Sequence, residues 1–195
     1  MWNMNPNETK IPDKRIMIEN TKTIPIYKII GPTDILPLVK QFSQELYDIW
    51  TTIPHWIIQA DLGRLLYIYY HGGMYLDCDC IIMKKILSSA SIVLFTERIV
   101  RLSSLGPREC NHPNNKVRIA NYAFMSTVKE HPFLKSVIIE CIRRLNLLSS
   151  KITKLDILWV CGPDVITSMY HLQKSRDVEL LDKSYLNHFR CGSWR

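Results

Sequence analysis

The stretch QADLGRLLYIYYHGGMYLDCD, residues 59–79, decides the fold. Apolar residues recur at helical spacing, at Ile58, Leu62, Leu65 and Tyr69. This spacing predicts a helix. The Gly72-Gly73 pair is expected to end the helix, because glycine adopts the left-handed conformation at low cost. A short strand over residues 74–76 is then expected to run into two aspartates.

Two pairs of charged residues in this stretch indicate a site for a ligand and a metal ion. Asp61 and Arg64 lie three residues apart, so that they share a helix face and can reach one ligand. Asp77 and Asp79 follow the strand, where both carboxylates can approach a hard cation such as Mn²⁺ or Mg²⁺ through oxygen. Taken alone, an Asp-x-Asp is also consistent with a polar turn after a strand.

The whole string is more specific than its parts. Ala60-Asp61 with Arg64, a spacer of helical length, and then Gly72-Gly73 with Tyr75, Asp77 and Asp79 resembles the DXD-containing glycosyltransferase family. That family includes the yeast-type initiating mannosyltransferases, the lactosylceramide galactosyltransferases and the catalytic domains of the large clostridial glucosylating toxins. The compact, anchor-free form also resembles glycosyltransferases of large DNA viruses.

Other segments are similar to this family in the same order along the chain. These are residues 2–6, Asn121–Ser126 with His131-Pro132-Phe133, Cys161–Asp164, and His188 with Ser193-Trp194. The resemblance implies an α/β protein of the glycosyltransferase-A fold, with one nucleotide-binding domain over residues 1–195. The domain is expected to stand alone or at the N-terminus of a longer protein.

The resemblance also implies roles for individual residues. It gives catalytic roles to Asp61, Arg64 and Asp79. The metal, Mn²⁺ or Mg²⁺, would be held by Asp77, Asp79 and His188. Residues expected to contact the donor are Asp61, Arg64, Tyr75, Asp77, Asn121, Ser193 and Trp194.

Several of these residues have a structural interpretation as well. Tyr75 suits a core position, Asn121 the start of a strand, His188 aromatic packing and Trp194 a cap on the core. Asp164 fits either a helix-start carboxylate that satisfies the helix dipole or a base on the acceptor side.

The implied reaction is transfer of a hexose from a nucleotide-diphospho-sugar, with a UDP-sugar such as UDP-glucose favoured, to a glycan or other hydroxyl acceptor. The family retains anomeric configuration, which needs no protein base. If the reaction inverted it, a carboxylate such as Asp164 or Glu97 would have to deprotonate the acceptor. Two alternatives are a non-catalytic relative that binds sugar nucleotides or glycans, and a metal-dependent phosphatase or nucleotidyltransferase.

One departure from the family concerns nucleotide binding. The chain begins at the family's tryptophan segment, so the first strand, which usually helps hold the base, is expected to be missing. Either residues 15–18 substitute for it, or base binding is reduced or built differently.

Composition narrows the class of protein. The chain has 195 residues, 47% of them hydrophobic and 22% charged, which suits one globular domain. It has no apolar run long enough to span a membrane and no signal-peptide pattern, and we expect a cytoplasmic enzyme. The net charge of +7 suits an anionic nucleotide, whereas the scattered basic residues argue against nucleic acid. The six cysteines lack zinc spacing and are expected to be free thiols in a reducing compartment, although their spacing is also consistent with two or three disulfides in a secretory lumen.

The remaining elements follow from local patterns. We expect a strand over 26–30 and then a helix capped by Thr33 or Asp34. The apolar face of that helix comprises Leu38, Val39, Phe42, Leu46 and Trp50. Residues 92–95 are typical of a strand buried on both faces. Residues 98–116 are expected to form a long irregular loop, followed by a strand from Asn121 and a helix from Pro132.

Overall fold

The computed structural model describes residues 16, 19, 20, 22, 28–53, 55–99, 117–149 and 151–189. In chain order these residues form α2 (Pro32–Phe42), α3 (Gln44–Trp50), α4 (Trp56–His71), β1 (Gly73–Leu76), β2 (Cys80–Ile82), β3 (Ile92–Ile99), β4 (Val117–Ser126), α5 (Pro132–Leu145), α6 (Lys154–Val160), α7 (Pro163–Gln173), β5 (Val178–Leu181), the 3₁₀ turn η2 (Lys183–Tyr185) and β6 (Leu186–His188).

The described strands form a mixed four-stranded sheet and a separate two-stranded ribbon. The larger sheet has the order β1-β4-β3-β5, in which only β3 and β5 run parallel. Strands β2 and β6 pair antiparallel, with Cys80 opposite His188. Helices α2–α4 precede β1–β4, and α5–α7 lie between β4 and β5 in the chain, so the predicted α/β class with a mixed central sheet is confirmed.

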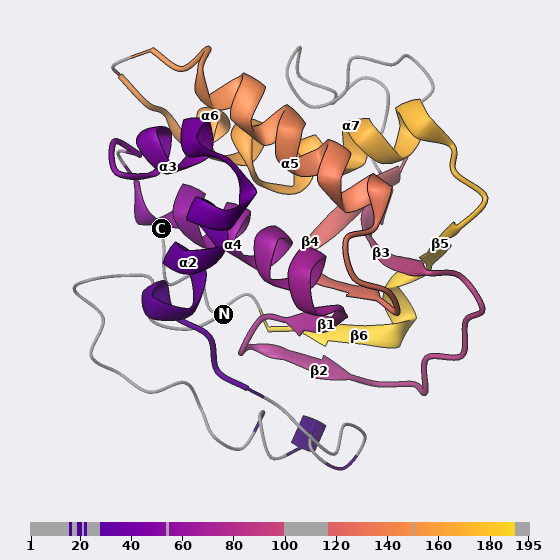
Figure 1. The fold of residues 1–195 in the computed structure, drawn as a ribbon. Helices are drawn as coiled ribbons and strands as arrows, with labels where there is room; N and C mark the ends of the chain where they lie inside the picture. Colours follow the sequence, from indigo (N-terminus) through magenta and orange to yellow (C-terminus); the bar gives the residue numbers. More distant parts are fainter. Residues whose placement is uncertain are drawn as a thin grey trace.

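The central sheet is covered on both faces, as the apolar run in β3 predicted. Ile92 and Leu94 face the main core, which they share with α4, α5 and α7, whereas Val93 and Phe95 face a second, smaller cluster. The ribbon of β2 and β6 contributes Cys80 and Leu186 to that cluster. Figure 1 shows the resulting layers, with the helices on one side of the sheet and the ribbon on the other.

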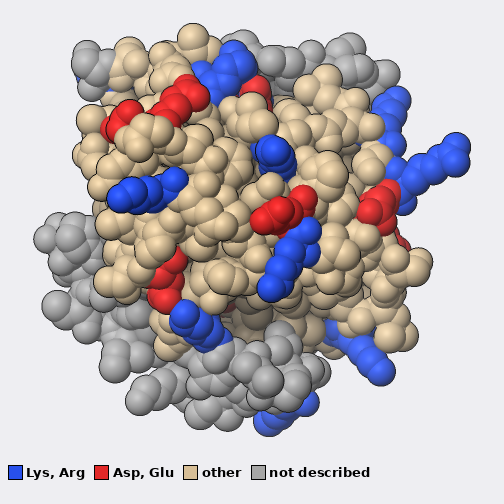
Figure 2. Space-filling view, in the orientation of Figure 1, with Lys and Arg blue, Asp and Glu red and all other residues tan. Residues whose placement is uncertain are grey.

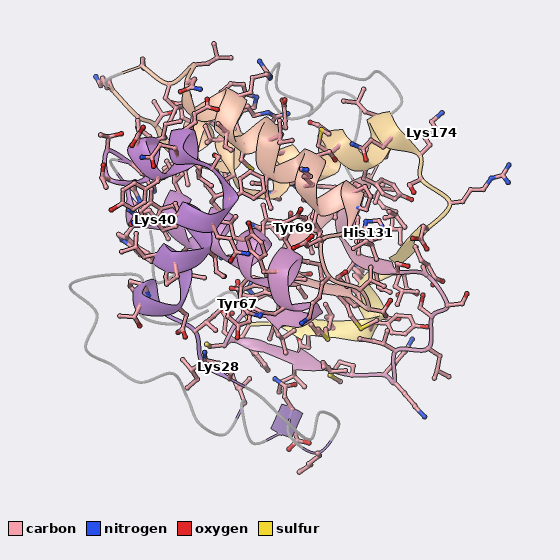
Figure 3. All side chains as sticks on the ribbon, in the orientation of Figure 1. Lys28, Lys40, Tyr67, Tyr69, His131 and Lys174 are labelled. Atoms are coloured by element: carbon pink, nitrogen blue, oxygen red, sulfur yellow. The ribbon has the colours of Figure 1, made fainter. Side chains whose placement is uncertain are left out.

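Helix α4 leads directly into the candidate site and ends as the glycine pair predicts. Its N-cap is His55, whose imidazole accepts a hydrogen bond from the Ile57 amide. Gly72 and Gly73 have φ angles of 68° and 87°, a backbone conformation that favours glycine. The ammonium group of Lys28 lies 5.7 Å from the ring centroid of Tyr67, which connects the segment before α2 to α4 (Figure 3).

Two predictions for the N-terminal half are wrong. Of the strand predicted over residues 26–30, residues 28–30 are not in a strand but lead straight to Gly31, the N-cap of α2, and residues 26 and 27 lie outside the described ranges. The predicted single helix is broken at Ser43, which is extended and whose hydroxyl accepts a hydrogen bond from the Leu46 amide. This local cap starts a new helix, and its apolar residues remain in the core.

Strand β3 extends two residues into the predicted loop, through Ile99, and β4 begins at Val117, before Asn121. Residues 100–116 of that loop lie outside the described part of the chain. Helix α5 begins after His131, whose Nδ1 accepts from the Phe133 amide and whose Nε2 lies 3.0 Å from Asp177. His131 therefore has the structural role of a helix cap.

The described part of the chain shows no helix with both the length and the apolar character needed to cross a membrane. Basic and acidic side chains are interspersed over the face shown in Figure 2. Four cysteines are free thiols, namely Cys78, Cys80, Cys141 and Cys161. The predictions for Cys110 and Cys191 concern residues outside the described ranges.

Candidate active site

Asp77, Asp79 and His188 come together where β1, β2 and β6 meet. Their ligand atoms all lie within 4.8 Å of one another, and His188 Nε2 is 3.3 Å from Asp79 Oδ1. The backbone explains this convergence across more than a hundred residues. Cys80 pairs with His188 in the ribbon, and the amide of Phe189 donates to the Asp79 carbonyl over 2.9 Å.

The three side chains have the chemistry of a divalent-metal site. Two carboxylates supply the oxygen ligands that Mg²⁺ and Mn²⁺ prefer, and the imidazole adds a nitrogen. All three side chains are partly buried, so a bound ion would remain accessible to a ligand. The donor set therefore fits a divalent cation.

The second pair from the motif, Asp61 and Arg64, is buried on α4. Arg64 Nη2 lies 2.8 Å from Asp61 Oδ1, and the two side chains are 10% and 7% exposed. Arg64 Nη1 lies 3.4 Å from Asp77 Oδ1. The guanidinium thus connects the helix pair to the aspartates after β1, and the two halves of the motif form one cluster.

Asn121 joins this cluster from the neighbouring strand β4. Its side-chain amide donates to Asp61 Oδ1 over 3.1 Å, and its backbone carbonyl accepts from Arg64 Nη1 over 2.8 Å. These contacts span about sixty residues of sequence. The structure therefore places Asn121 next to both residues with which it was predicted to share a donor site.

Tyr75 lies behind the cluster, in the core. Its side chain is buried, its hydroxyl donates to Asp77 Oδ1, and its ring centroid lies 4.7 Å from the Arg64 guanidinium carbon. A cation over an aromatic face is held by the ring quadrupole. Tyr75 can therefore hold the side chains of Asp77 and Arg64 in position, whether or not it also contacts the donor.

Burial sets the protonation behaviour of the pair on α4. It raises the pKa of Asp61 to about 7, against the opposing field of Arg64. Burial opposes the charge of Arg64 as well, but Tyr75, Asp77 and Asp61 outweigh it and raise the pKa of Arg64 above its usual range. Arg64 is thus a permanent cation, whereas Asp61 titrates near neutrality.

The two candidate acceptor-side carboxylates both face Arg118 on β4. Arg118 lies 2.9 Å from Asp164 Oδ1 and 3.1 Å from Glu97 Oε2. Asp164 is at the start of α7, as predicted, and is buried. Its place in the first turn of α7 and its buried ion pair with Arg118 favour the structural interpretation of Asp164.

Sequence reasoning missed one residue beside the candidate metal ligands, Tyr122. Its ring stacks on that of His188, with centroids 4.1 Å apart and an interplanar angle of 29°. No spacing in the sequence signals this contact, because it joins strands of two different sheets. The predictions for Ser193 and Trp194 and for residues 2–6 fall outside the described residues, as does the predicted substitute strand over residues 15–18 except for residue 16.

Comparison with known proteins agrees with this geometry. A family described as "Glycosyltransferase sugar-binding region containing DXD motif" matches residues 3–110, more than half of the chain. No curated protein sequence matches the chain. Among solved structures, "PaToxG Glycosyltransferase" is similar at a TM-score of 0.56 and 16% identity, covering 81% of this chain.

This chain spans 62% of that structure, and the likeness concerns the fold, for which it supports the predicted glycosyltransferase-A type. The family match includes α4 and the Asp-x-Asp after β1, the residues around which the described site is built. The chain therefore belongs to the family of glycosyltransferase sugar-binding regions containing the DXD motif, a family of enzymes.

Proposed function

We propose that this glycosyltransferase transfers a hexose from a nucleotide-diphospho-sugar to a hydroxyl group of a glycan or other acceptor, using a divalent metal. A UDP-hexose such as UDP-glucose is the first donor to test. The observation that supports the proposal best is the convergence of Asp77, Asp79 and His188 beside the buried Asp61–Arg64 pair.

Asp79, His188 and Asp77 would hold the metal, Mn²⁺ or Mg²⁺. When bound, such an ion neutralises negative charge that develops on a departing diphosphate. Asp77 contacts Tyr75 and Arg64 through Oδ1. Its remaining oxygen would therefore serve the metal or the nucleotide.

The pair on α4 would bind the donor sugar. Asp61 contacts both Arg64 and Asn121 through Oδ1, so Oδ2 is the oxygen suited to accept a hydrogen bond from a sugar hydroxyl. Arg64 would donate to donor oxygens, since its planar fork presents several N–H groups. The network that surrounds both side chains would hold them ready before the donor binds.

No general base is required if the reaction retains configuration, as we propose. The environment of Asp164 and Glu97 supports this choice, because Arg118 ion-pairs with both carboxylates. A protein base for inversion would have to be poised near the operating pH and within reach of the acceptor hydroxyl.

The direct test is release of nucleoside diphosphate from a panel of nucleotide sugars with Mn²⁺. We expect release from one donor, its loss in Asp79→Ala and in the presence of EDTA, and its persistence in Asp48→Ala, which removes an exposed carboxylate on α3. Acceptor screening with the selected donor would then show sugar transfer.

The alternatives give different products. A binding relative would show donor binding by thermal shift without release, and a phosphatase would release inorganic phosphate. A panel with neither release nor a donor-induced thermal shift would contradict the proposal.

A further inference from the structure

Tyr122 on β4 contacts two of the three candidate metal ligands, and it does so through two different groups. Its ring stacks against the imidazole of His188, with centroids 4.1 Å apart. Its backbone carbonyl accepts a hydrogen bond from the amide of Asp77 over 2.8 Å. Tyr122, in the central sheet, thus contacts both the turn after β1 and the end of β6.

The backbone bond extends an existing ladder. Strands β1 and β4 pair antiparallel as far as Leu76 opposite Ala123. The bond from Asp77 to Tyr122 continues this pairing by one residue, so the position of Asp77 is set by the main chain of a central strand. No substitution of the Tyr122 side chain would remove this bond.

His188 is held less firmly by its own backbone. It is the last residue of β6, a three-residue strand that pairs only with the three-residue β2 among the described strands. A two-stranded ribbon of that length is marginally stable unless it packs on other elements. Here the ribbon packs on the sheet through the small hydrophobic cluster that contains Tyr122, Leu186 and Cys80.

The stack also limits the side-chain freedom of His188. The imidazole is 20% exposed, so packing alone leaves it room to change rotamer. The Tyr122 ring stacks on the imidazole, with centroids 4.1 Å apart and an interplanar angle of 29°, and so favours one orientation of the imidazole plane. In that plane Nε2 lies toward Asp79, at 3.3 Å. Partners that orient a metal ligand in this way contribute to metal affinity.

We propose that Tyr122 is a positioning residue, whose ring orients the His188 imidazole for metal binding while its carbonyl fixes Asp77. This inference rests on the proposed metal site. Tyr122 itself acts on the ligand side chain and not on the substrate.

The test compares Mn²⁺ binding, followed by electron paramagnetic resonance of the free ion, in wild type and four variants. Tyr122→Leu removes the aromatic face, Tyr122→Phe keeps it, and Asp79→Ala removes a ligand. Phe95→Leu is the matched control, because Phe95 is fully buried in the same cluster on β3 and undergoes the same type of change.

We expect Tyr122→Leu to weaken Mn²⁺ binding by about 10–100-fold, the range typical of residues that orient metal ligands. Tyr122→Phe and Phe95→Leu should bind Mn²⁺ as wild type does, and Asp79→Ala should lose binding. Wild-type affinity in Tyr122→Leu, or equal weakening in Phe95→Leu, would overturn the role of Tyr122 alone. Absence of Mn²⁺ binding in wild type would overturn the metal site and this inference together.

A second measurement needs no destabilising variant. In metal-free wild type, the ring protons of His188, assigned by comparison with His188→Gln, should be shifted upfield by the stacked Tyr122 ring. The shift should persist in Tyr122→Phe. His188 ring protons at ordinary positions in wild type would overturn the proposal, even if Tyr122→Leu proved unable to fold.

Discussion

Arg64 Nη2 lies 2.8 Å from Asp61 Oδ1, one turn apart on α4, and both side chains are buried. The pair sits against Asn121 on one side and Asp77 on the other. A buried ion pair of this kind is costly to break, because the remaining partner keeps its polarity without its counter-charge. The relationship therefore links the stability of the fold to the candidate donor site.

Replacing Arg64 should destabilise the protein strongly. Arg64→Leu leaves Asp61 buried without its counter-charge, and at pH 8 we expect a loss of about 3–5 kcal/mol in the free energy of unfolding. Arg143→Leu is the control, since Arg143 is 57% exposed in its pair with Glu140 and should cost at most about 1 kcal/mol. Urea unfolding measures both; equal stability of Arg64→Leu and wild type would contradict the account.

The titration of Asp61 should appear in the pH dependence of stability. Burial raises the pKa of Asp61 to about 7 in the folded protein, from 3.8 in the unfolded chain. Between these values the folded state keeps a proton that the unfolded state releases, so this contribution is full below pH 3.8 and is lost as the pH rises through 7. Asp61→Asn has no such titration.

The measurement is the free energy of unfolding of wild type and Asp61→Asn at pH 5 and pH 8. Other titrating groups cancel in the difference between the two proteins. We expect the advantage of wild type over Asp61→Asn to shrink at the higher pH. An advantage that stays constant or grows would show that Asp61 is ionised throughout this range.

The two glycines after α4 should respond differently to alanine. Both have positive φ angles, so each alanine is strained by about 1–3 kcal/mol. A Cβ at position 72 would in addition lie 3.3 Å from the Ser126 carbonyl, whereas one at position 73 meets nothing within 4 Å. Thermal unfolding should therefore rank Gly72→Ala below Gly73→Ala, and the reverse order would refute the described turn.

A substitution at Glu97 tests the stereochemical part of the proposal. Glu97 is ion-paired with Arg118 at 3.1 Å, and a retaining reaction does not require it as a base. Once a donor and acceptor are known, Glu97→Gln should keep kcat close to that of wild type. A fall of about 10²–10⁴-fold, the usual contribution of a general base, would instead support inversion.

Much of the fold could be predicted where a local pattern determines the structure. Ile92–Phe95 is apolar at every position, and β3 is buried on both faces. The glycine pair ends α4 because only a positive φ fits there. Ser43 was missed because its side chain caps α3 in the middle of a continuous apolar pattern. Residues 28–30 resembled a strand, but the chain turns into α2 at Gly31.

The candidate site likewise contains residues that local sequence spacing could predict and residues that it could not. The spacing of Asp61 and Arg64 indicated one shared ligand, and that of Asp77 and Asp79 a cation or a polar turn, whereas the family resemblance joined the two pairs. Asn121 and His188 could be proposed only from family resemblance, since their contacts with Asp61 and Asp79 depend on strand register. Tyr122 was missed because a stack on His188 arises from two strands in different sheets, which no sequence spacing encodes.

The central claim is that Asp77, Asp79 and His188 would hold a divalent metal, and that this metal would assist binding of the donor diphosphate. The most direct measurement is titration of Mn²⁺, followed by electron paramagnetic resonance, with and without UDP, in wild type and Asp79→Asn. The account predicts that UDP tightens Mn²⁺ binding in wild type, that Mn²⁺ tightens UDP binding by the same factor, and that Asp79→Asn abolishes both effects. Mn²⁺ and UDP binding independently of each other, or a coupling that survives in Asp79→Asn, would contradict it.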